Sequence, residues 1–131
     1  MAQPSLNLIA HGIDLVEVSR VRGLLEKSGD RFKERVYTAD ESSYCDSCAS
    51  PAMHYAARFA AKEAVAKALG TGLADGVIWT EIEVCRDEKG VPSIALHGAA
   101  AERARAMGIC VWRISLTHTS ELAGASVVAA G

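Results

Sequence analysis

The sequence predicts an α+β fold, in which an antiparallel sheet packs against one long helix and several shorter helices. Three observations lead to this prediction. Strand-like apolar segments stand near the start and in the second half of the chain, one long alanine-rich segment lies between them, and glycine-containing turns separate the elements. The length of 131 residues, of which half are hydrophobic and 23% charged, is typical of one globular domain, which we expect to span residues 1–131.

The first half of the chain predicts one strand followed by three short helical segments. Residues 7–18 are rich in Ile, Leu and Val, as a strand is. A helical pattern follows over residues 19–29, with the serine as N-cap and the glycine as the stop, and a second short helix is expected over residues 31–37. Thr38 and Glu41 have the spacing of a capping box, which predicts that a third short helix begins there.

The long helix has clear start and stop signals. Ser50 precedes Pro51, and proline is favoured at the first helical position. The helix is expected to run to about Leu69 and to end at Gly70. The remaining elements are expected to be a strand over 77–85, a turn over 87–90, a strand over 91–97, a short helix over 98–108, and strands over 109–118 and 122–130.

Charge and N-terminal composition limit the possible environments. A formal net charge of -2 provides no general basic surface, so we expect no nucleic-acid partner. The N-terminal segment lacks a basic region followed by a long apolar run, as a secretory signal or a membrane span would have. We therefore expect a cytoplasmic protein with no membrane association.

The chain contains four cysteines, of which Cys45 and Cys48 form a CxxC pair. Cys85 and Cys110 do not supply the second pair that a structural zinc site requires. The simpler interpretation is free thiols in a reducing compartment, and an unrelated zinc or redox domain is the alternative.

The long helix carries two pairs of charged residues among its alanines. Glu63 and Lys67 are four positions apart, as are Arg58 and Lys62, and a wheel at about 100° per residue places the two pairs on opposite flanks of the apolar arc. The simpler interpretation is a solvated surface, where such a pair stabilises a helix by only a few tenths of a kcal/mol.

Two further polar residues lie on otherwise apolar strand faces. Asp14 shares a face with Gly12 and Val16, and a buried aspartate requires a cation, which could be a lysine, an arginine or a metal ion. His118 shares a face with Trp112 and Leu116. A single histidine in such a position is more often a core residue than a ligand.

Together, these segments resemble the holo-acyl-carrier-protein synthases, which are small phosphopantetheinyl transferases. The matching segments are "GIDLVEVSRV", "RFKERVYTADE", "RFAAKEAVAKALGTG" and "SLTHT", in the same order and at similar spacing over nearly the whole chain. The resemblance implies a phosphopantetheinyl transferase-like fold. It also implies transfer of 4′-phosphopantetheine from coenzyme A to a serine of apo acyl carrier protein in fatty acid biosynthesis, with release of adenosine 3′,5′-bisphosphate. The family's homotrimer, with active sites at subunit interfaces, is expected as well.

The resemblance also assigns site residues. It implies that Asp14 and Glu63 hold Mg²⁺, for which one or two carboxylates with phosphate and water are usual ligands. Lys67 completes the catalytic group by reaching the phosphates. The expected coenzyme A contacts are Arg58, Lys62, Lys67, Gly70, Thr71 and His118, with pairing to Glu63 as the alternative for Lys62. Arg20, Arg31 and Phe32 are expected to dock the acidic carrier protein, and an ordinary solvated helix is the alternative.

Some alternatives stay open. Larger relatives have a second acid two residues after the first aspartate, where this chain has Val16, so we expect a two-carboxylate site. Two competing interpretations remain. The chain is either a relative of the larger class or a non-catalytic module that only binds a nucleotide or a carrier. The base that deprotonates the serine, either Glu63 or a metal-bound water, is not distinguished.

Overall fold

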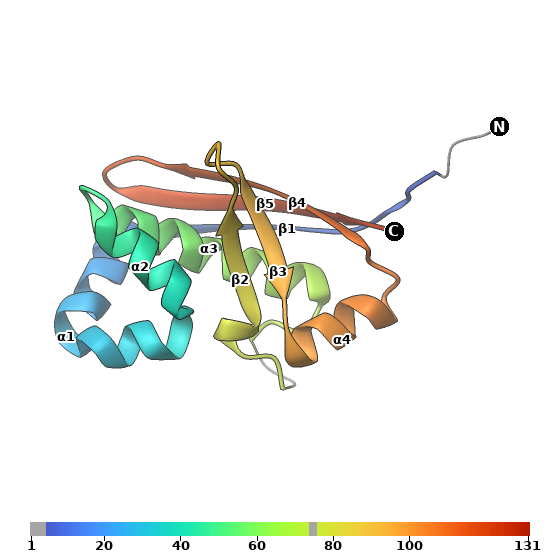
Figure 1. The fold of residues 1–131 in the computed structure, drawn as a ribbon, viewed down its shortest axis with the longest axis horizontal. Coiled ribbons are helices and arrows are strands. Elements are labelled where there is room, and N and C mark those ends of the chain that lie inside the picture. Colours follow the sequence, from blue (N-terminus) through green and yellow to red (C-terminus); the bar gives the residue numbers. More distant parts are fainter. Residues whose placement is uncertain (1–4, 74–75) are drawn as a thin grey trace.

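The computed structural model describes residues 5–73 and 76–131. A three-stranded antiparallel sheet, in the order β1 (Leu8–Glu17), β5 (Leu122–Ala130) and β4 (Val111–His118), forms one layer. The helices gather on one side of this sheet, and a separate hairpin of β2 (Ile82–Arg86) and β3 (Pro92–Leu96) stands beside α3 (Pro51–Leu69) (Figure 1). This arrangement confirms the predicted α+β fold.

The last strand holds the sheet together because it pairs on both edges. β5 lies between β1 and β4, so that Ala125 is the register partner of both Asp14 and Leu116. The segments next to the sheet also meet, since Asn7 and Gly131 exchange two backbone hydrogen bonds of 2.9 and 3.1 Å. β1 and β4 are therefore the opposite edges of the sheet.

The long helix α3 (Pro51–Leu69) begins at its predicted proline and ends at its predicted glycine. Gly70 adopts a left-handed conformation with φ of 77°, which favours glycine, and its N–H donates to the carbonyl of Lys67. Alanines on α3 pack directly onto the sheet. At the closest point an added Cβ on Gly12 would lie 2.0 Å from the carbonyl oxygen of Ala64, so β1 and α3 approach each other more closely than any larger residue allows.

The first helices differ in detail from the prediction. Helix α1 (Val18–Val36) begins after Glu17 rather than at the predicted cap Ser19, and its two predicted halves join at a kink at Gly29, where φ is 41°. Helix α2 (Ala39–Ser47) has the predicted capping box. The Thr38 N–H donates to Glu41 Oε1 at 2.8 Å, and the Glu41 N–H donates to Thr38 Oγ1 at 3.2 Å.

The segment after α3 is the clearest difference in the second half. The strand expected over 77–85 begins only at Ile82, because residues Trp79–Glu81 form a 3₁₀ turn. The Glu81 carboxylate explains this turn, since it accepts hydrogen bonds from the N–H groups of Ile78 at 3.1 Å and Ala99 at 3.0 Å. It thereby joins the turn to helix α4 (Gly98–Ala106).

No helix within the described residues is long and apolar enough to cross a membrane, and residues 1–4 of the N-terminal segment lie outside that description.

A buried ion pair connects α3 to α2 and β2. Lys62 is fully buried, and its ammonium donates to Glu41 Oε1 at 2.8 Å and to the carbonyls of Trp79 at 3.1 Å and Ile82 at 2.5 Å. Burial lowers the pKa of Lys62, and the charge of Glu41 opposes that shift. Glu41 Oε2 accepts the N–H of Val84 at 2.8 Å, so every polar atom of the pair has a partner.

We predict that breaking this pair strongly destabilises the fold. Lys62→Met leaves the carboxylate of Glu41 buried without its cation, which should lower the free energy of unfolding by about 3–5 kcal/mol. The double variant Glu41→Gln with Lys62→Met should recover part of the loss. Urea unfolding at one protein concentration measures both variants.

The matched control is the exposed pair of Lys33 and Asp46, whose closest atoms are 3.1 Å apart. Lys33→Gln should cost less than about 1 kcal/mol. Equal losses for Lys62→Met and Lys33→Gln would contradict the structural role of the buried pair.

Candidate active site

The first group of predicted site residues meets where β1 passes α3. Asp14 points from β1 toward the helix because it shares the inward face of the strand with Gly12 and Val16. Lys67 Nζ donates to Asp14 Oδ1 at 2.9 Å and to the carbonyl of Ile13 at 3.1 Å. The Asp14 side chain is only 17% exposed, whereas that of Lys67 is 54% exposed. The cation that the buried aspartate required is therefore Lys67 in this structure, and its ammonium still faces solvent.

Glu63 lies one turn before Lys67 and belongs to the same group. Burial raises the pKa of its carboxyl group, the charge of Asp14 raises it further, and the charges of Lys67 and Arg20 oppose the shift. Asp14 likewise raises the pKa of Lys67, through their hydrogen bond first and their opposite charges second. The structure thus brings together two carboxylates and two cations from β1, α1 and α3.

This group fits a Mg²⁺ ion that is completed by phosphate and water. Two carboxylates in mutual repulsion present hard oxygen donors, and Mg²⁺ usually takes one or two protein carboxylates at phosphate-binding sites. Within residues 5–73 and 76–131, no group of three or more His, Cys, Asp or Glu side chains could hold a metal.

A second group of predicted residues lines a cleft of about 460 Å³ on the other flank of α3. Arg58 is 2% exposed, and its Nη1 donates to the carbonyl of His54 at 3.3 Å. Its Nε and Nη2 atoms are buried without a hydrogen-bond partner. The His118 ring lies 5.5 Å from the His54 ring, centroid to centroid. The cleft is lined by His54, Ala57, Arg58, Arg86, Gly90, Val91, Pro92, Ile114, Ser115, Leu116 and His118.

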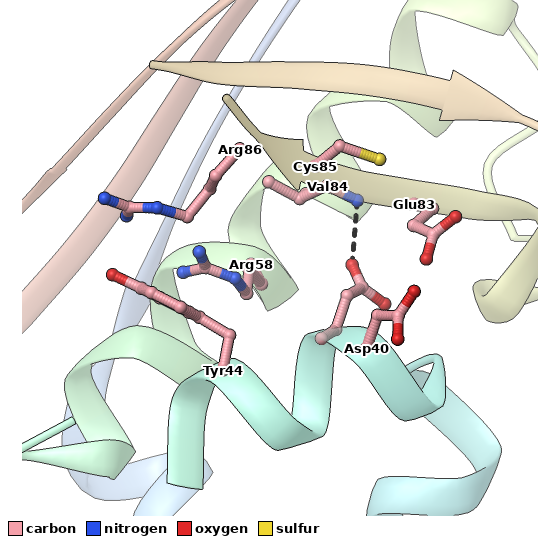
Figure 2. A pocket seen from close by; sticks show the side chains of 8 residues that line it. Asp40, Tyr44, Arg58, Glu83, Val84, Cys85 and Arg86 are labelled. Carbon is pink, nitrogen blue, oxygen red and sulfur yellow. Dashed lines mark hydrogen bonds between the residues drawn. The ribbon is translucent and has the colours of Figure 1, made fainter. Parts of the chain in front are cut away.

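A smaller cleft of about 320 Å³ adjoins the same arginines between α2 and β2. Figure 2 shows Tyr44, Arg58 and Arg86 approaching one another from α2, α3 and β2. The guanidinium carbons of Arg58 and Arg86 lie 4.6 and 4.4 Å from the centre of the Tyr44 ring. Unlike the larger cleft, this one is also lined by carboxylates, those of Asp40, Glu41 and Glu83.

Comparisons with known proteins identify the family of this chain. Residues 10–110 match the 4′-phosphopantetheinyl transferase superfamily. The chain belongs to this superfamily. The holo-[acyl-carrier-protein] synthase of Chloroflexus aurantiacus is 48% identical over 134 residues, covering 93% of this chain and 98% of the relative.

Solved structures of the superfamily share the fold. The holo-[acyl-carrier-protein] synthase of Neisseria meningitidis superposes with a TM-score of 0.85 and 32% identity, over 94% of this chain and 98% of that one. The enzyme of Helicobacter pylori in complex with coenzyme A superposes with a TM-score of 0.80 and 28% identity, over 91% and 98% of the two chains. The predicted resemblance to the holo-acyl-carrier-protein synthases is therefore confirmed.

Two residues assigned from the superfamily resemblance lie in the core of this structure. Lys62 is enclosed in its ion pair with Glu41, so it neither pairs with Glu63 nor presents its ammonium to a ligand, which corrects both alternatives for that residue. Phe32 is 8% exposed and packs near Tyr37 and Phe59, with ring centroids 5.6 and 6.3 Å away, so the expected docking surface keeps Arg20 and Arg31 without an exposed Phe32.

The loop after α3 is held by local hydrogen bonds. Thr71 Oγ1 donates to the carbonyl of Gly72 at 2.7 Å, and Arg103 Nε donates to the carbonyl of Leu69 at 3.0 Å.

Burial raises the pKa of the Cys45 thiol to about 12. Zinc and redox chemistry both require a thiolate, so this environment disfavours the alternative built on Cys45 and Cys48.

Sequence reasoning missed Tyr44, His54 and Arg86 as neighbours of Arg58. His54 lies four residues before Arg58, and this spacing predicts that both side chains share a face of the helix. No local pattern connects Arg86 with that face, because the contact depends on where the β2–β3 hairpin packs.

We predict that Gly12→Ala damages the fold and the site together. The new methyl group would overlap the backbone carbonyl of Ala64, which cannot rotate away as a side chain can. Overpacking of this kind costs about 1–3 kcal/mol, and the resulting shift of β1 should separate Asp14 from Lys67.

Thermal unfolding and a transfer assay measure the two effects of Gly12→Ala. Gly23→Ala is the control, because an added Cβ on Gly23 meets nothing within 4 Å. A Gly12→Ala protein as stable and active as the Gly23→Ala protein would contradict the close β1–α3 contact.

Proposed function

We propose that this chain transfers 4′-phosphopantetheine from coenzyme A to a serine of apo acyl carrier protein and releases adenosine 3′,5′-bisphosphate. The observation that carries the proposal is the pair of sites on α3. One flank presents Asp14, Glu63 and Lys67, and the other presents, beside His118, the buried guanidinium of Arg58, whose Nε and Nη2 have no hydrogen-bond partner. The first group suits a pyrophosphate and the second a nucleotide phosphate. The relatives' shared name, holo-[acyl-carrier-protein] synthase, supports the same reaction.

The residues of the first group have separate roles in this reaction. Asp14 and Glu63 would hold Mg²⁺, which when bound draws charge from the pyrophosphate oxygens. Lys67 carries an exposed ammonium beside them and stabilises the charge that develops as the P–O bond of coenzyme A breaks. The serine oxygen attacks the phosphorus of the phosphopantetheine, and the bisphosphate leaves with the bonding electron pair.

Glu63 is the group that we propose to receive the serine proton, directly or through a water molecule. Its carboxylate makes no hydrogen bond within the described part of the chain, whereas Asp14 is already bound to Lys67.

A second proposal concerns assembly as a homotrimer with active sites between chains. The outer face of the sheet carries exposed apolar side chains that no helix covers, with Ile13 and Leu15 exposed by 68% and 65% on β1 and Val128 by 41% on β5. The two halves of the site also lie at opposite edges of the sheet, with Asp14 on β1 and His118 on β4. Association through this face would allow one chain's Asp14 group to meet the Arg58 cleft of the next chain.

The docking of the carrier protein is proposed along α1. Arg20 lies on the surface with its guanidinium carbon 5.5 Å from the Phe59 ring, and its charge acts on Glu63. Arg31 is also exposed on the same helix. An acidic carrier protein would therefore bring its serine next to the carboxylate group. A cytoplasmic location and a role in fatty acid biosynthesis follow as part of the same proposal.

The test of the reaction is the mass of the carrier. With coenzyme A, Mg²⁺ and an apo acyl carrier protein, wild type should add the phosphopantetheine mass, which mass spectrometry measures. Glu63→Gln should lower kcat/KM by about 10²–10⁴-fold. Glu102→Gln changes an exposed glutamate on α4 and should leave the rate unchanged. No mass gain across several carriers would exclude the proposed reaction, and near-normal transfer by Glu63→Gln at saturating Mg²⁺ would exclude its role.

The pH profile tests the state of Glu63. Without Mg²⁺ the folded pKa of Glu63 is raised above the ordinary 4.5, first by burial and then by the charge of Asp14. Bound Mg²⁺ favours the ionised carboxylate, so the acid limb of kcat/KM should lie at a higher pH when Mg²⁺ is subsaturating than when Mg²⁺ saturates the site, and Glu63→Gln should lose this limb. An acid limb that persists in Glu63→Gln would assign it to another group.

The assembly proposal predicts complementation between two inactive chains. Ile13→Lys with Leu15→Lys should give monomers by light scattering, because it places two charges in an apolar interface. When Asp14→Asn and Arg58→Gln proteins are mixed after dissociation, some interfaces regain both intact halves, and part of the activity should return. No recovery from mixed oligomers would show that each chain contains its own complete site.

A further inference from the structure

His11 and Arg113 form a basic row on the outer face of the sheet, which is the face opposite the helices (Figure 1). Val128 on the central strand β5 is the register partner of both residues, so the three side chains lie next to one another across the three strands. All three are exposed. Arg113 Nη1 donates to the carbonyl of Trp112 at 3.2 Å, and neither His11 nor Arg113 forms an ion pair with a described residue.

This row interrupts a face that carries little other charge. Ile13 and Leu15 follow His11 at the outward positions of β1, where they are exposed by 68% and 65%. The outward positions of β4 and β5 carry Val, Leu, Gly, Ser and Thr besides Arg113. The one carboxylate at an outward position of these three strands is that of Glu17, at the far end of β1. His11 therefore has a cation in its row and no acid beside it.

A second copy of the chain is the partner that this face requires. Asp14 lies on the edge strand β1 and His118 on the edge strand β4, so a second chain on this face is what joins the two halves of the site in the proposed assembly. The charged side chains that the second copy presents on the same face are again His11, Arg113 and Glu17. Two of these three side chains are basic, so the copy adds more cations than carboxylates.

Assembly makes the charge of His11 decisive, because it removes water from the row. A neutral imidazole enters an interface at little cost, whereas an imidazolium loses its hydration and has no carboxylate in the row to replace it. Arg113 adds repulsion of the same sign from two strands away, about 10 Å at the usual strand spacing. The long stem of Arg113 lets its guanidinium reach water at the rim, which the shorter side chain of His11 cannot do.

We infer that His11 is a proton-dependent switch for the self-association of the outer sheet face, so that chains bind one another while His11 is neutral and separate when it is protonated. This inference rests on the proposed assembly and not on the proposed reaction. Histidine gains its charge between about pH 8 and pH 5. The separated chain takes up more protons than the assembled chain, so the association should weaken as the pH falls through this range and recover as it rises.

The switch has a consequence for activity, because the proposed site is complete only between two chains. Near pH 6 the transfer rate per chain should rise with enzyme concentration, since more chains are then assembled. The acid limb that depends on Glu63 has no such dependence on enzyme concentration.

The test measures association at two pH values without any substrate. Sedimentation equilibrium at several protein concentrations gives the concentration at which half of the chains are separated. For wild type this concentration should be at least about tenfold higher at pH 5.5 than at pH 7.5, since each excluded proton changes the equilibrium by up to about tenfold per pH unit. His11→Leu should associate equally well at both pH values, and His11→Lys should associate weakly at both.

Two further variants serve as controls. His97→Gln changes a histidine that lies just before α4 and is 3.1 Å from Glu83 Oε1, away from the outer sheet face, so it should keep the wild-type pH dependence. Arg113→Gln removes the like charge and leaves His11 in place, so it should reduce the pH dependence without abolishing it. Circular dichroism at both pH values checks that every variant is folded.

The outcomes separate this inference from the proposed function. Association that is the same at pH 5.5 and pH 7.5 would overturn the switch and leave the assembly intact, whereas separate chains at every pH and concentration would overturn both. A pH dependence that persists in His11→Leu would assign it to another group and exclude His11. If wild type modifies no carrier but loses its association at low pH through His11, the reaction is wrong and the switch stands.

Discussion

The close contact between β1 and α3 is the constraint on which the rest of the structure depends. Gly12 allows the carbonyl of Ala64 to lie against the strand, and the alanines of α3 keep the helix close to the sheet along its length. Because Asp14 follows Gly12 on the same strand face, this contact also determines that Lys67 reaches Asp14. The same contact therefore determines both the packing of β1 on α3 and the position of Asp14 next to Lys67.

The charged side chains of α3 differ in burial and in hydrogen-bond partners, because different elements cover the different sides of the helix. Lys62 is fully buried and must be paired, and Glu41 meets that requirement while capping its own helix. Arg58 is also buried but keeps two nitrogens free beside a cleft. Glu63 and Lys67 remain near solvent, where a ligand can reach them. Similar side chains on one helix thus lie in different environments, because each faces a different neighbour.

Asp14 and His118 lie at opposite edges of the sheet. β5 separates β1 from β4, so that one edge carries Asp14 and the other carries His118. The apolar residues Ile13 and Leu15 lie on the face that no helix covers in this chain. A single chain therefore has both chemical groups but separates them, and this arrangement is the physical basis for the proposed assembly.

The sequence by itself determined most of the fold and predicted the residues of the proposed carboxylate group. Strand alternation, the Ser50–Pro51 start and the Gly70 stop are local signals, and motif resemblance located Asp14, Glu63 and Lys67. The tertiary structure decided which partners the remaining charges have. Lys62 pairs with Glu41 from a distant helix, and Arg86 reaches Tyr44 through the packing of a hairpin. Such contacts depend on how elements pack, and because packing joins residues far apart in sequence, no local pattern along the chain records them.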